Sequence, residues 1–447
     1  MQENIKTTDV EKVVAGGFCV GCGGCAAVDS GINMRFTDIG VYEPIITKIT
    51  NPKIDEVCPF SNKGLHENKL AQPSLGKSDE DKLGTYLSLK AGHDLDQTAR
   101  LNSSSGGGAS WVLKQLFLQG DIDKVIHIKE SAGQLFKYSV SSSIEQINQG
   151  AKTRYYPIEI SEVVDFVKQN EGRYAFIGIP CFVKTVKRLA LVDEDFNDRL
   201  KFTISIFCGH LKSAAFGESL AWQLGVEPNH IQKIDFRHKI ATLPANDYGI
   251  EVADSNSKVH VSPMRNLLGK DWGMGAFRLK GCDFCDDIVG ELADVSFGDA
   301  WLDKYKKDSK GTNLIVIRNK LIQDLFDKGS TEQSFYTEDV SSSEIVQSQN
   351  ASYRHRRDGV KYRMAKFKKK SQWHPEKREF SDLKQPNFLD KINWDFRAWY
   401  SQQTHKYFLE AKRKKSLDIY TRFVKRGTLM AKVLQKLIRV HKRLTRS

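Results

Sequence analysis

Residues 280–301 read KGCDFCDDIVGELADVSFGDAW, and the rest of the chain is organised around them. Cys282 and Cys285 form a C-x-x-C turn, and two thiolates at that spacing can bind one soft metal ion or one metal cluster. The residues after the turn, ADVSFGDAW, are typical of a strand that ends in Gly298-Asp299. The stretch therefore predicts a thiolate site beside a sheet, but it lacks a second pair of cysteines nearby.

Two other cysteines follow segments that have the pattern of buried strands. Cys181 comes after RYAFIGIP and Cys208 comes after KFTISIF, and both segments are rich in apolar and β-branched residues. Cofactors collect where the strands of an α/β sheet end. We therefore infer that Cys181, Cys208, Cys282 and Cys285 converge on one site. A nucleophilic role for Cys181 is less favoured, because the candidate bases His210 and His238 have no diagnostic spacing.

A second set of cysteines lies near the start of the chain. Residues 16–25, GGFCVGCGGC, place Cys19, Cys22 and Cys25 in a C-x2-C-x2-C pattern, with glycines that allow the backbone to curl around a cluster. Cys58 in VCPF is the simplest fourth ligand, because a Cys-Pro pair resembles the end of a bacterial ferredoxin motif. Closing the intervening loop costs only about 1–2 kcal/mol of chain entropy. The pattern favours a 4Fe–4S cluster, and a structural zinc site is the alternative.

A Ser/Gly-rich turn precedes a predicted helix in residues 101–120, LNSSSGGGASWVLKQLFLQG. The turn contains Ser104, Ser105, Gly106 and Gly107, and it leads into an apolar pattern that Gly120 ends. A helix N-terminus after such a turn offers free amides and a positive dipole end to an anion, so phosphate binding is the natural use. A flexible turn with a good N-cap explains the pattern about equally well.

A short basic and aromatic segment, GAKTRYY at residues 150–156, provides a second candidate for cofactor binding. Lys152 and Arg154 stand beside aromatic residues there, which suits a nucleotide cofactor but is equally ordinary in a surface turn. Predicted helices and strands alternate through this part of the chain, which indicates an α/β sheet. Short β-type runs between residues 231 and 280 indicate an antiparallel excursion from it.

The composition is that of a soluble globular protein of 447 residues with eight cysteines and no apolar run long enough to span a membrane. The first residues have no apolar core, so we expect no signal peptide and a cytoplasmic location. Cysteines stay reduced in that compartment, which favours metal or cluster ligation over disulfides.

The net charge of +13 is unevenly distributed along the chain. Residues 351–447 contain 28 Lys and Arg but 8 Asp and Glu, whereas the first 350 residues contain 40 and 47. Apolar residues recur at helical spacing in this tail, so it reads as a set of basic amphipathic helices. Such helices bind anionic membranes, here at the inner face, or acidic partners, and the equally weighted alternative is that they cover the protein's own core. Nucleic acid is not favoured, because no recognised binding motif is present.

Four motifs, SSGGGA, GIPC, IFC and CDFCDD with ELADVSFGDAW, occur in an order that resembles the family of coenzyme F420 hydrogenase/dehydrogenase beta subunits. The resemblance implies an iron–sulfur flavoprotein. It would place a 4Fe–4S cluster on Cys181, Cys208, Cys282 and Cys285 beside FAD. The turn at Ser105, Gly106 and Gly107 would touch the flavin, and GAKTRYY would correspond to a Gly-x-Lys-Tyr-like segment. Related members include reductases of chlorophyll derivatives and proteins associated with surface polysaccharide synthesis.

These observations predict three parts. They are a ferredoxin-like cluster module at 1–65, an α/β (α+β, mixed-sheet) central domain with FAD and 4Fe–4S at 80–345, and a basic helical tail at 350–447. The resemblance implies an oxidoreductase in which electrons pass between a ferredoxin-like or deazaflavin (coenzyme F420-type) carrier and a substrate, through two 4Fe–4S clusters and FAD. No catalytic residue is assigned. The alternatives are a non-catalytic electron-transfer subunit and a zinc-stabilised interaction protein.

Overall fold

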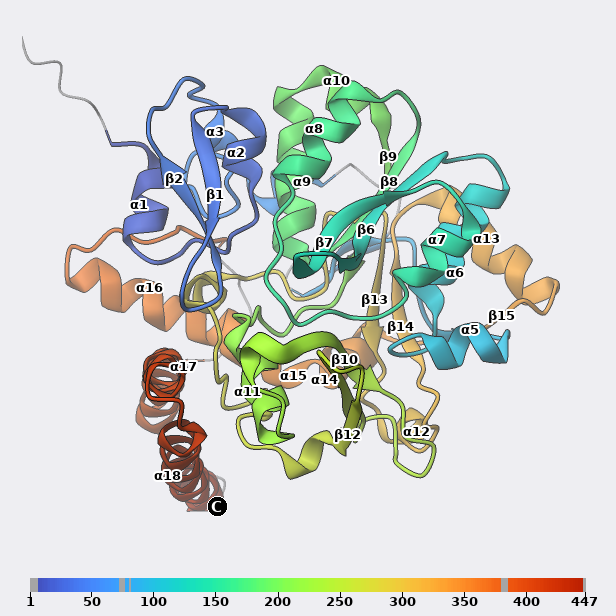
Figure 1. The fold of residues 1–447 in the computed structure, drawn as a ribbon. Helices are drawn as coiled ribbons and strands as arrows, with labels where there is room; N and C mark the ends of the chain where they lie inside the picture. Colours follow the sequence, from blue (N-terminus) through green and yellow to red (C-terminus); the bar gives the residue numbers. More distant parts are fainter. Residues whose placement is uncertain (1–6, 72–76, 80–81, 379–384, 445–447) are drawn as a thin grey trace, which may run out of the picture.

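The computed structural model describes residues 7–71, 77–79, 82–378 and 385–444. Its centre is an eight-stranded mixed sheet with the order β15-β5-β14-β13-β9-β8-β6-β7 (Figure 1). Strands β6, β8, β9 and β13 run parallel to one another, and the remaining pairs are antiparallel. The strands are β5 (Ser88–Asp94), β6 (Lys124–Ser131), β7 (Gln134–Ser141), β8 (Tyr174–Gly178), β9 (Leu200–Ile206), β13 (Val295–Asp299), β14 (Asn313–Ile317) and β15 (Phe335–Asp339). The predicted mixed α/β sheet is confirmed.

Helices cover both faces of this sheet. The alternation in β14 shows how the two faces are built, because Ile315 and Ile317 pack under one layer of helices while Leu314 and Val316 face the other side. The first layer contains α6 (Gly108–Leu118) and α13 (Lys320–Thr331). Around the sheet lie α5 (Gln97–Asn102), α7 (Ile144–Gln149), α8 (Ser161–Gln169), α9 (Pro180–Val192), α10 (Glu194–Arg199) and α12 (Asp303–Lys306).

The N-terminal part is a small unit with a two-stranded antiparallel sheet of its own. It consists of α1 (Asp9–Ala15), α2 (Gly24–Val28), β1 (Ile32–Phe36), β2 (Tyr42–Ile46), α3 (Ile54–Val57) and α4 (Glu67–Leu70). Its apolar residues join the core of the central part, because Phe18, Cys22 and Val57 belong to the same buried cluster as Phe182 and Val183 of α9. A short pair, β3 (Lys77–Asp79) and β4 (Gly84–Tyr86), follows it in the chain.

The predicted antiparallel excursion is confirmed as a separate three-stranded sheet. It contains β10 (Ile231–His238), β11 (Gly249–Asp254) and β12 (Val259–Pro263), and α11 (Ala215–Gln223) packs against β10. The connection back to the central sheet contains the 3-10 turns η2 (Met264–Asn266) and η3 (Lys280–Phe284); η1 (Pro228–His230) precedes β10. The turn η3 holds the C-x-x-C sequence.

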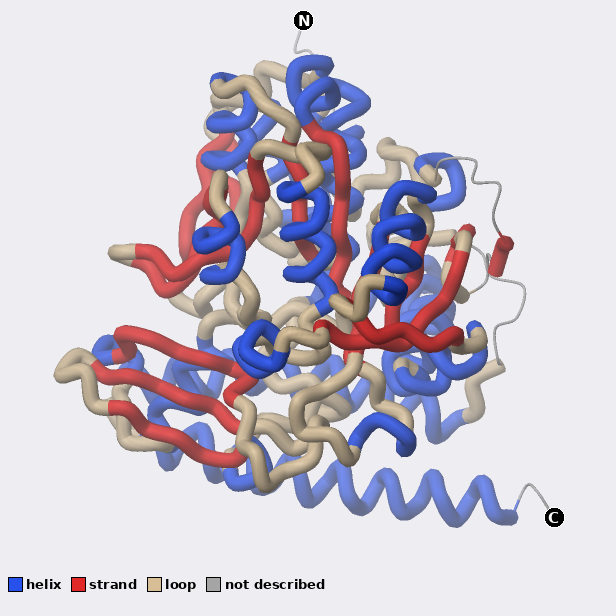
Figure 2. The backbone as a smooth tube through the Cα atoms, turned by 90° about the vertical axis from the view of Figure 1, so that its right-hand side faces the viewer, coloured by secondary structure: helices blue, strands red, loops and turns tan. Residues whose placement is uncertain are grey.

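The C-terminal part is helical, as predicted. It consists of α14 (Ser342–Ser348), α15 (Asn350–Tyr353), the π-helical segment η4 (Arg354–Asp358), α16 (Gly359–Lys369), α17 (Phe388–Arg413) and α18 (Leu417–Leu444). The last two helices pack on each other, and α18 runs along one edge of the molecule toward the C-terminus (Figure 2). None of the helices within the described residues is both long and apolar enough to cross a bilayer.

Candidate redox site

The ends of neighbouring strands bring the central cysteines together. Cys181 lies in the first turn of α9, directly after β8, and Cys208 lies just past its parallel neighbour β9. The chain between the antiparallel excursion and β13 adds Cys282 and Cys285. Burial, together with the charge of neighbouring cysteines, raises the pKa of the Cys208 thiol to about 11 and that of Cys282 to about 12, although the charge of Arg356 opposes the shift at Cys208. Burial and the same three neighbours raise the pKa of Cys181. The structure thus gathers the four thiols that the sequence groups.

Hydrogen-bond donors point at the sulfurs of this central quartet. The backbone N–H of Leu211 donates to Cys282 Sγ at 3.2 Å. Arg356 Nη2 donates to Cys285 Sγ at 2.6 Å, and Arg356 Nε donates to the Cys285 carbonyl at 3.2 Å. The same guanidinium also donates to the carbonyl oxygens of Cys208 and Asp287. One arginine therefore contacts two of the loops that carry the cysteines, and its positive charge faces a group of potential thiolates.

Arg356 belongs to the segment that the sequence assigns to the start of a basic tail. His355, Arg357 and Arg363 from the same segment are buried as well, each at 6% exposure or less. His355 Nε2 and Arg278 Nη2 lie 2.7 and 2.9 Å from Asp283 Oδ1. Burial alone would raise the pKa of Asp283, but the charge of Arg278 and the hydrogen bond from His355 hold it well below its usual range. The first part of the tail therefore supports the cysteine site instead of presenting a basic surface.

The N-terminal cysteines also lie around one point. Cys19, Cys22 and Cys25 lie on the loop before α2 and in α2, and Cys58 ends α3. All four line a small cavity whose other walls are mostly apolar. Burial raises the pKa of Cys58 to about 12, and the charge of Cys22 adds to the shift. The backbone N–H of Gly21, which has a φ of 68°, donates to Cys19 Sγ at 3.4 Å.

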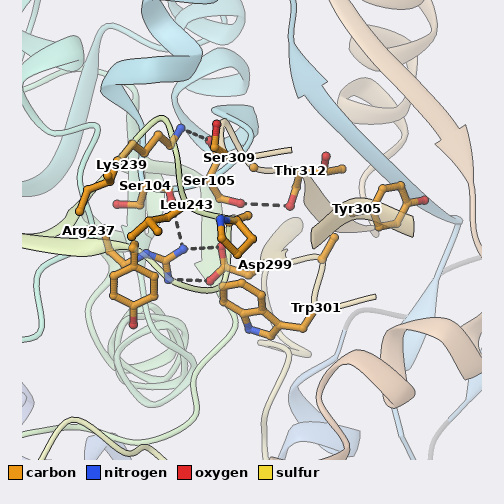
Figure 3. A pocket seen from close by; sticks show the side chains of 16 residues that line it. Ser104, Ser105, Arg237, Lys239, Leu243, Asp299, Trp301, Tyr305, Ser309 and Thr312 are labelled. Carbon is orange, nitrogen blue, oxygen red and sulfur yellow. Dashed lines mark hydrogen bonds and ion pairs between the residues drawn. The ribbon is translucent and has the colours of Figure 1, made fainter. Parts of the chain in front are cut away.

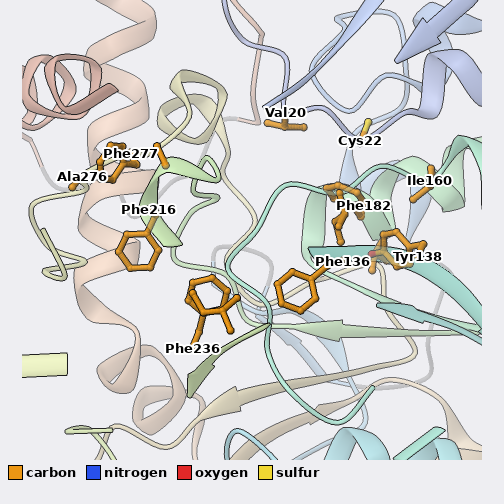
Figure 4. Packing of buried hydrophobic residues seen from close by; sticks show 14 of the residues in the cluster. Val20, Cys22, Phe136, Tyr138, Ile160, Phe182, Phe216, Phe236, Ala276 and Phe277 are labelled. Carbon is orange, nitrogen blue, oxygen red and sulfur yellow. The ribbon is translucent and has the colours of Figure 1, made fainter. Parts of the chain in front are cut away.

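The first turn of α9 connects the two quartets. Thr185 Oγ1 donates to the Cys181 carbonyl at 2.9 Å and lies 3.5 Å from Cys22 Sγ, so a single side chain contacts a cysteine of each group. Burial raises the pKa of the Tyr138 hydroxyl, and the charges of Cys181 and Cys22 contribute to that shift. Figure 4 shows Cys22 beside Phe182 and Tyr138 in the buried core. Cys22 of the first quartet and Cys181 of the second are therefore neighbours across Thr185.

The predicted Ser/Gly turn lies at the N-terminus of α6, opposite the start of β14. Thr153 N–H donates to Ser104 Oγ at 2.7 Å, and Ser105 Oγ donates to the Thr312 carbonyl at 3.0 Å. Gly106 has no room for a side chain, because a Cβ there would lie 2.8 Å from the Asn313 nitrogen. A cavity of about 110 Å³ lies in front of the turn and reaches Gly107, Gly108, Ala109 and Ser110 at the start of the helix. The turn is thus held firmly against a hollow that a phosphate could enter.

A larger cavity of about 410 Å³ extends from this region to the central quartet. Cys208, His210, Lys212 and Trp272 line one side of it. It shares wall residues with the smaller cavity, namely Thr153, Tyr155, Ile206, Phe207 and Asp299, so the two hollows adjoin. His210 Nε2 is buried without a hydrogen-bond partner among the residues that the structure describes. The combined space leads from the N-terminus of α6 to Cys208.

An arginine–aspartate pair lies where these hollows meet a third, shown in Figure 3. Arg237 on β10 makes two contacts with Asp299 at the end of β13, at 2.9 and 3.0 Å. Arg237 Nη2 also donates to the Ser104 carbonyl at 3.1 Å, and so ties the Ser/Gly turn to the antiparallel sheet. The sequence does not single out this pair, because Arg237 and Asp299 are ordinary residue types in and at the ends of predicted strands.

The two basic residues predicted near the nucleotide have different positions. Arg154 lines the larger cavity, lies over the Phe136 ring at 5.0 Å and pairs with Glu130 at 3.7 Å. Lys152 is not among the residues lining that cavity, and its Nζ lies 2.9 Å from Asp235. The structure therefore brings Arg154, but not Lys152, to the space beside the cysteines.

The two groups of cysteines offer the ligand type that iron–sulfur clusters use. Among residues 7–71, 77–79, 82–378 and 385–444, no three Cys, His, Asp or Glu side chains are arranged to hold a single metal ion. Two sets of four buried or half-buried free thiols are nevertheless present, and one backbone N–H points at a sulfur of each set. Thiolate ligands with amide donors to sulfur are the environment that 4Fe–4S clusters require. The thiol ligands and these N–H donors are thus of the kind that iron–sulfur clusters use.

Comparison with known proteins identifies the family of the central part of the chain. Residues 90–165 match the model for the N-terminal part, and residues 171–343 the model for the C-terminal part, of the coenzyme F420 hydrogenase/dehydrogenase beta subunit. The chain is 20% identical to one of the subunits of the F(420)H(2) dehydrogenase of Methanosarcina mazei over 351 residues, which covers 75% of this chain and 89% of that protein. A chain of the F420-reducing [NiFe] hydrogenase complex from Methanosarcina barkeri gives a TM-score of 0.48 at 19% identity, over 67% of this chain and 94% of that one. Since the two family matches together cover more than half of its length, this chain belongs to the family of coenzyme F420 hydrogenase/dehydrogenase beta subunits.

Proposed function

We propose that this protein is an iron–sulfur flavoprotein oxidoreductase that passes electrons between a soluble carrier and a substrate through two 4Fe–4S clusters and FAD. The carrier would be a ferredoxin-like protein or a deazaflavin of the coenzyme F420 type. The observation that carries the proposal is the arrangement of two cysteine quartets in contact through Thr185, the second of which opens on a cavity that reaches the N-terminus of α6.

Each part of this path has its own residues. Cys19, Cys22, Cys25 and Cys58 would hold the cluster nearer the N-terminus, and Cys181, Cys208, Cys282 and Cys285 would hold the central one. When bound, the clusters would carry single electrons and the flavin would exchange electrons singly or in pairs. Thr185 and the apolar residues around Cys22 exclude water from the contact between the quartets.

The residues around the hollows would hold the flavin in a fixed orientation. Ser104, Ser105, Gly106 and Gly107 present the N-terminus of α6, which suits the pyrophosphate. The larger cavity would receive the ring system between Cys208 and Arg154. Arg237 holds the turn in place through the Ser104 carbonyl, while its charge is balanced by Asp299.

Metal and flavin analysis of the protein purified without oxygen tests the proposal. We expect about eight irons per chain, four for each cubane, together with one flavin. Iron near zero with stoichiometric zinc would contradict it and would support the zinc-stabilised alternative. Full iron and flavin content without reduction of any small-molecule acceptor by the reduced protein would instead indicate a non-catalytic electron-transfer subunit.

The position of the flavin is tested by filling the cavity at Gly209. A Cβ at this glycine would meet only Trp272 and Ser352, at 3.8 and 3.9 Å, so a larger side chain can enter the hollow without striking the backbone. Gly209→Leu should lower the flavin content severalfold while iron stays unchanged, because the added branch occupies the space for the ring. Gly209→Ala is the matched control and should keep its flavin. Equal flavin absorbance in both variants would place the flavin elsewhere.

A further inference from the structure

The two C-terminal helices divide into a packed part and an exposed part. Near its start, α18 lies against α17: Tyr420 and Val424 are fully buried, and the Phe423 ring stacks on Tyr407 with centroids 4.3 Å apart. Close contact continues to Gly427, where a Cβ would strike the Tyr400 ring. This first half of α18 therefore covers the protein's own core, which is one of the two alternatives that the sequence leaves open for the tail.

The second half of α18 exposes an apolar stripe. Large apolar side chains there are about half exposed or more: Leu429 (65%), Met430 (51%), Val433 (54%), Leu437 (53%) and Val440 (47%). Spacings of three and four residues put these side chains on one side of a helix. We call these five residues the apolar stripe. An apolar row of this length on a helix edge is typical of a surface that docks on something apolar.

A basic row lies beside the apolar stripe. Lys425, Lys432, Lys436 and Arg439 are exposed, and the helical geometry places them on one flank of it. We call these four residues the basic flank. No acidic residue occurs from Ile419 to the end of the chain. The surface thus combines exposed apolar side chains with positive charge that no neighbouring carboxylate of the same helix balances.

We propose that the apolar stripe and the basic flank dock this protein on an anionic lipid bilayer, with α18 lying in the plane of the interface. An interfacial helix needs an apolar face of moderate hydrophobicity beside Lys and Arg residues that reach the lipid headgroups, and α18 has both. A flat surface can reach the helix, because it runs along the edge of the molecule (Figure 2).

Two other arrangements of α18, association with a second copy and a membrane-spanning position, are less favourable. A second copy of the chain would bring two basic flanks together without an acidic residue to pair with them, which opposes association through this face. A spanning position is excluded for α18 by its charge, since no described helix is apolar enough to cross a bilayer. A bilayer surface can contact the apolar stripe with its acyl region and the basic flank with its anionic headgroups at the same time.

Vesicle binding of the full chain tests the proposal. The wild type should sediment with vesicles of phosphatidylglycerol and phosphatidylcholine but not with vesicles of phosphatidylcholine alone. Lys432→Gln/Lys436→Gln/Arg439→Gln should weaken the binding roughly tenfold or more, since each basic residue contributes to attraction by an anionic surface. The matched control, Lys137→Gln/Lys258→Gln/Lys320→Gln, removes the same charge from exposed lysines elsewhere and should bind like the wild type.

Insertion of the stripe is tested with two substitutions at Val433. Val433→Asp should reduce binding to the level of the basic-flank variant without changing iron or flavin content. Val433→Trp should keep the binding, and its fluorescence should shift to the blue and be quenched by brominated lipids. Failure of the wild type to bind anionic vesicles would overturn the proposal. Full vesicle binding by Val433→Asp would also overturn it. The same holds if the wild type is a dimer in solution and Val433→Asp dissociates the dimer but leaves vesicle binding unchanged.

Discussion

Cys285→Ser is expected to lose about half of the iron of the wild type, because one of two cubanes would lack a ligand. The remaining half should sit on the N-terminal quartet, whose thiols the substitution does not touch. Since the central quartet adjoins the larger cavity, transfer of electrons from a reduced carrier to the flavin should fall to background. Iron analysis, together with EPR spectra of the reduced protein, measures both effects.

The matched variant is Cys58→Ser, which should remove the other half of the iron and leave the spectrum of the central cluster. The two spectra should then add up to that of the wild type. Unchanged iron in Cys285→Ser would show that the central quartet does not ligate a cluster. Thermal unfolding of each variant distinguishes the loss of one cluster from a general loss of iron caused by unfolding.

Arg356→Gln is expected to lower the midpoint potential of the central cluster and to make the cluster more labile. Arg356 is 1% exposed, and its guanidinium donates to Cys285 Sγ at 2.6 Å. A charge-assisted hydrogen bond of this kind contributes about 2 kcal/mol, and it stabilises the more negative, reduced cluster more than the oxidised one. The potential should therefore fall by on the order of 50–100 mV. A redox titration followed by EPR measures the shift.

Two variants control this experiment. Arg354→Gln removes a charge two residues away from an exposed position, and its potential should match the wild type. Arg356→Lys keeps the charge but cannot reproduce the fork that contacts several carbonyls, so it should lie between the wild type and the glutamine variant. A potential in Arg356→Gln equal to that of the wild type, at full iron content, would refute the role of Arg356.

Strand ends and cysteine spacing were enough to predict much of this molecule. The apolar segments before Cys181 and Cys208 mark β8 and β9, and because parallel neighbours end at the same edge, their cysteines had to be close. Local patterns also identified the helix that starts at Gly108 and the antiparallel excursion. These features follow from short-range periodicity, which a sequence displays directly.

Other features of the site depend on long-range packing that periodicity does not encode. Arg356 stands in a run of basic residues that looks solvated, yet the π-helical segment η4 turns it toward Cys285, 71 positions earlier in the chain. The pairing of Arg237 with Asp299 likewise requires that the antiparallel sheet fold back over the end of β13. The apolar pattern of α18 is continuous, although its first half is buried against α17 and its second half is exposed. Only the position of α17 shows where burial ends.

The close fit between α2 and α9 limits how the N-terminal unit can be exchanged. A Cβ at Gly24 would strike Thr185 Cγ2 and would lie 3.1 Å from Val57 Cγ1, so only glycine fits at that point of the contact. A cluster-binding unit transplanted from a relative would therefore dock correctly only if it also carries glycine at this position. The first turns of α9 and the N-terminal unit should consequently be exchangeable only together, both in natural recombination and in protein engineering.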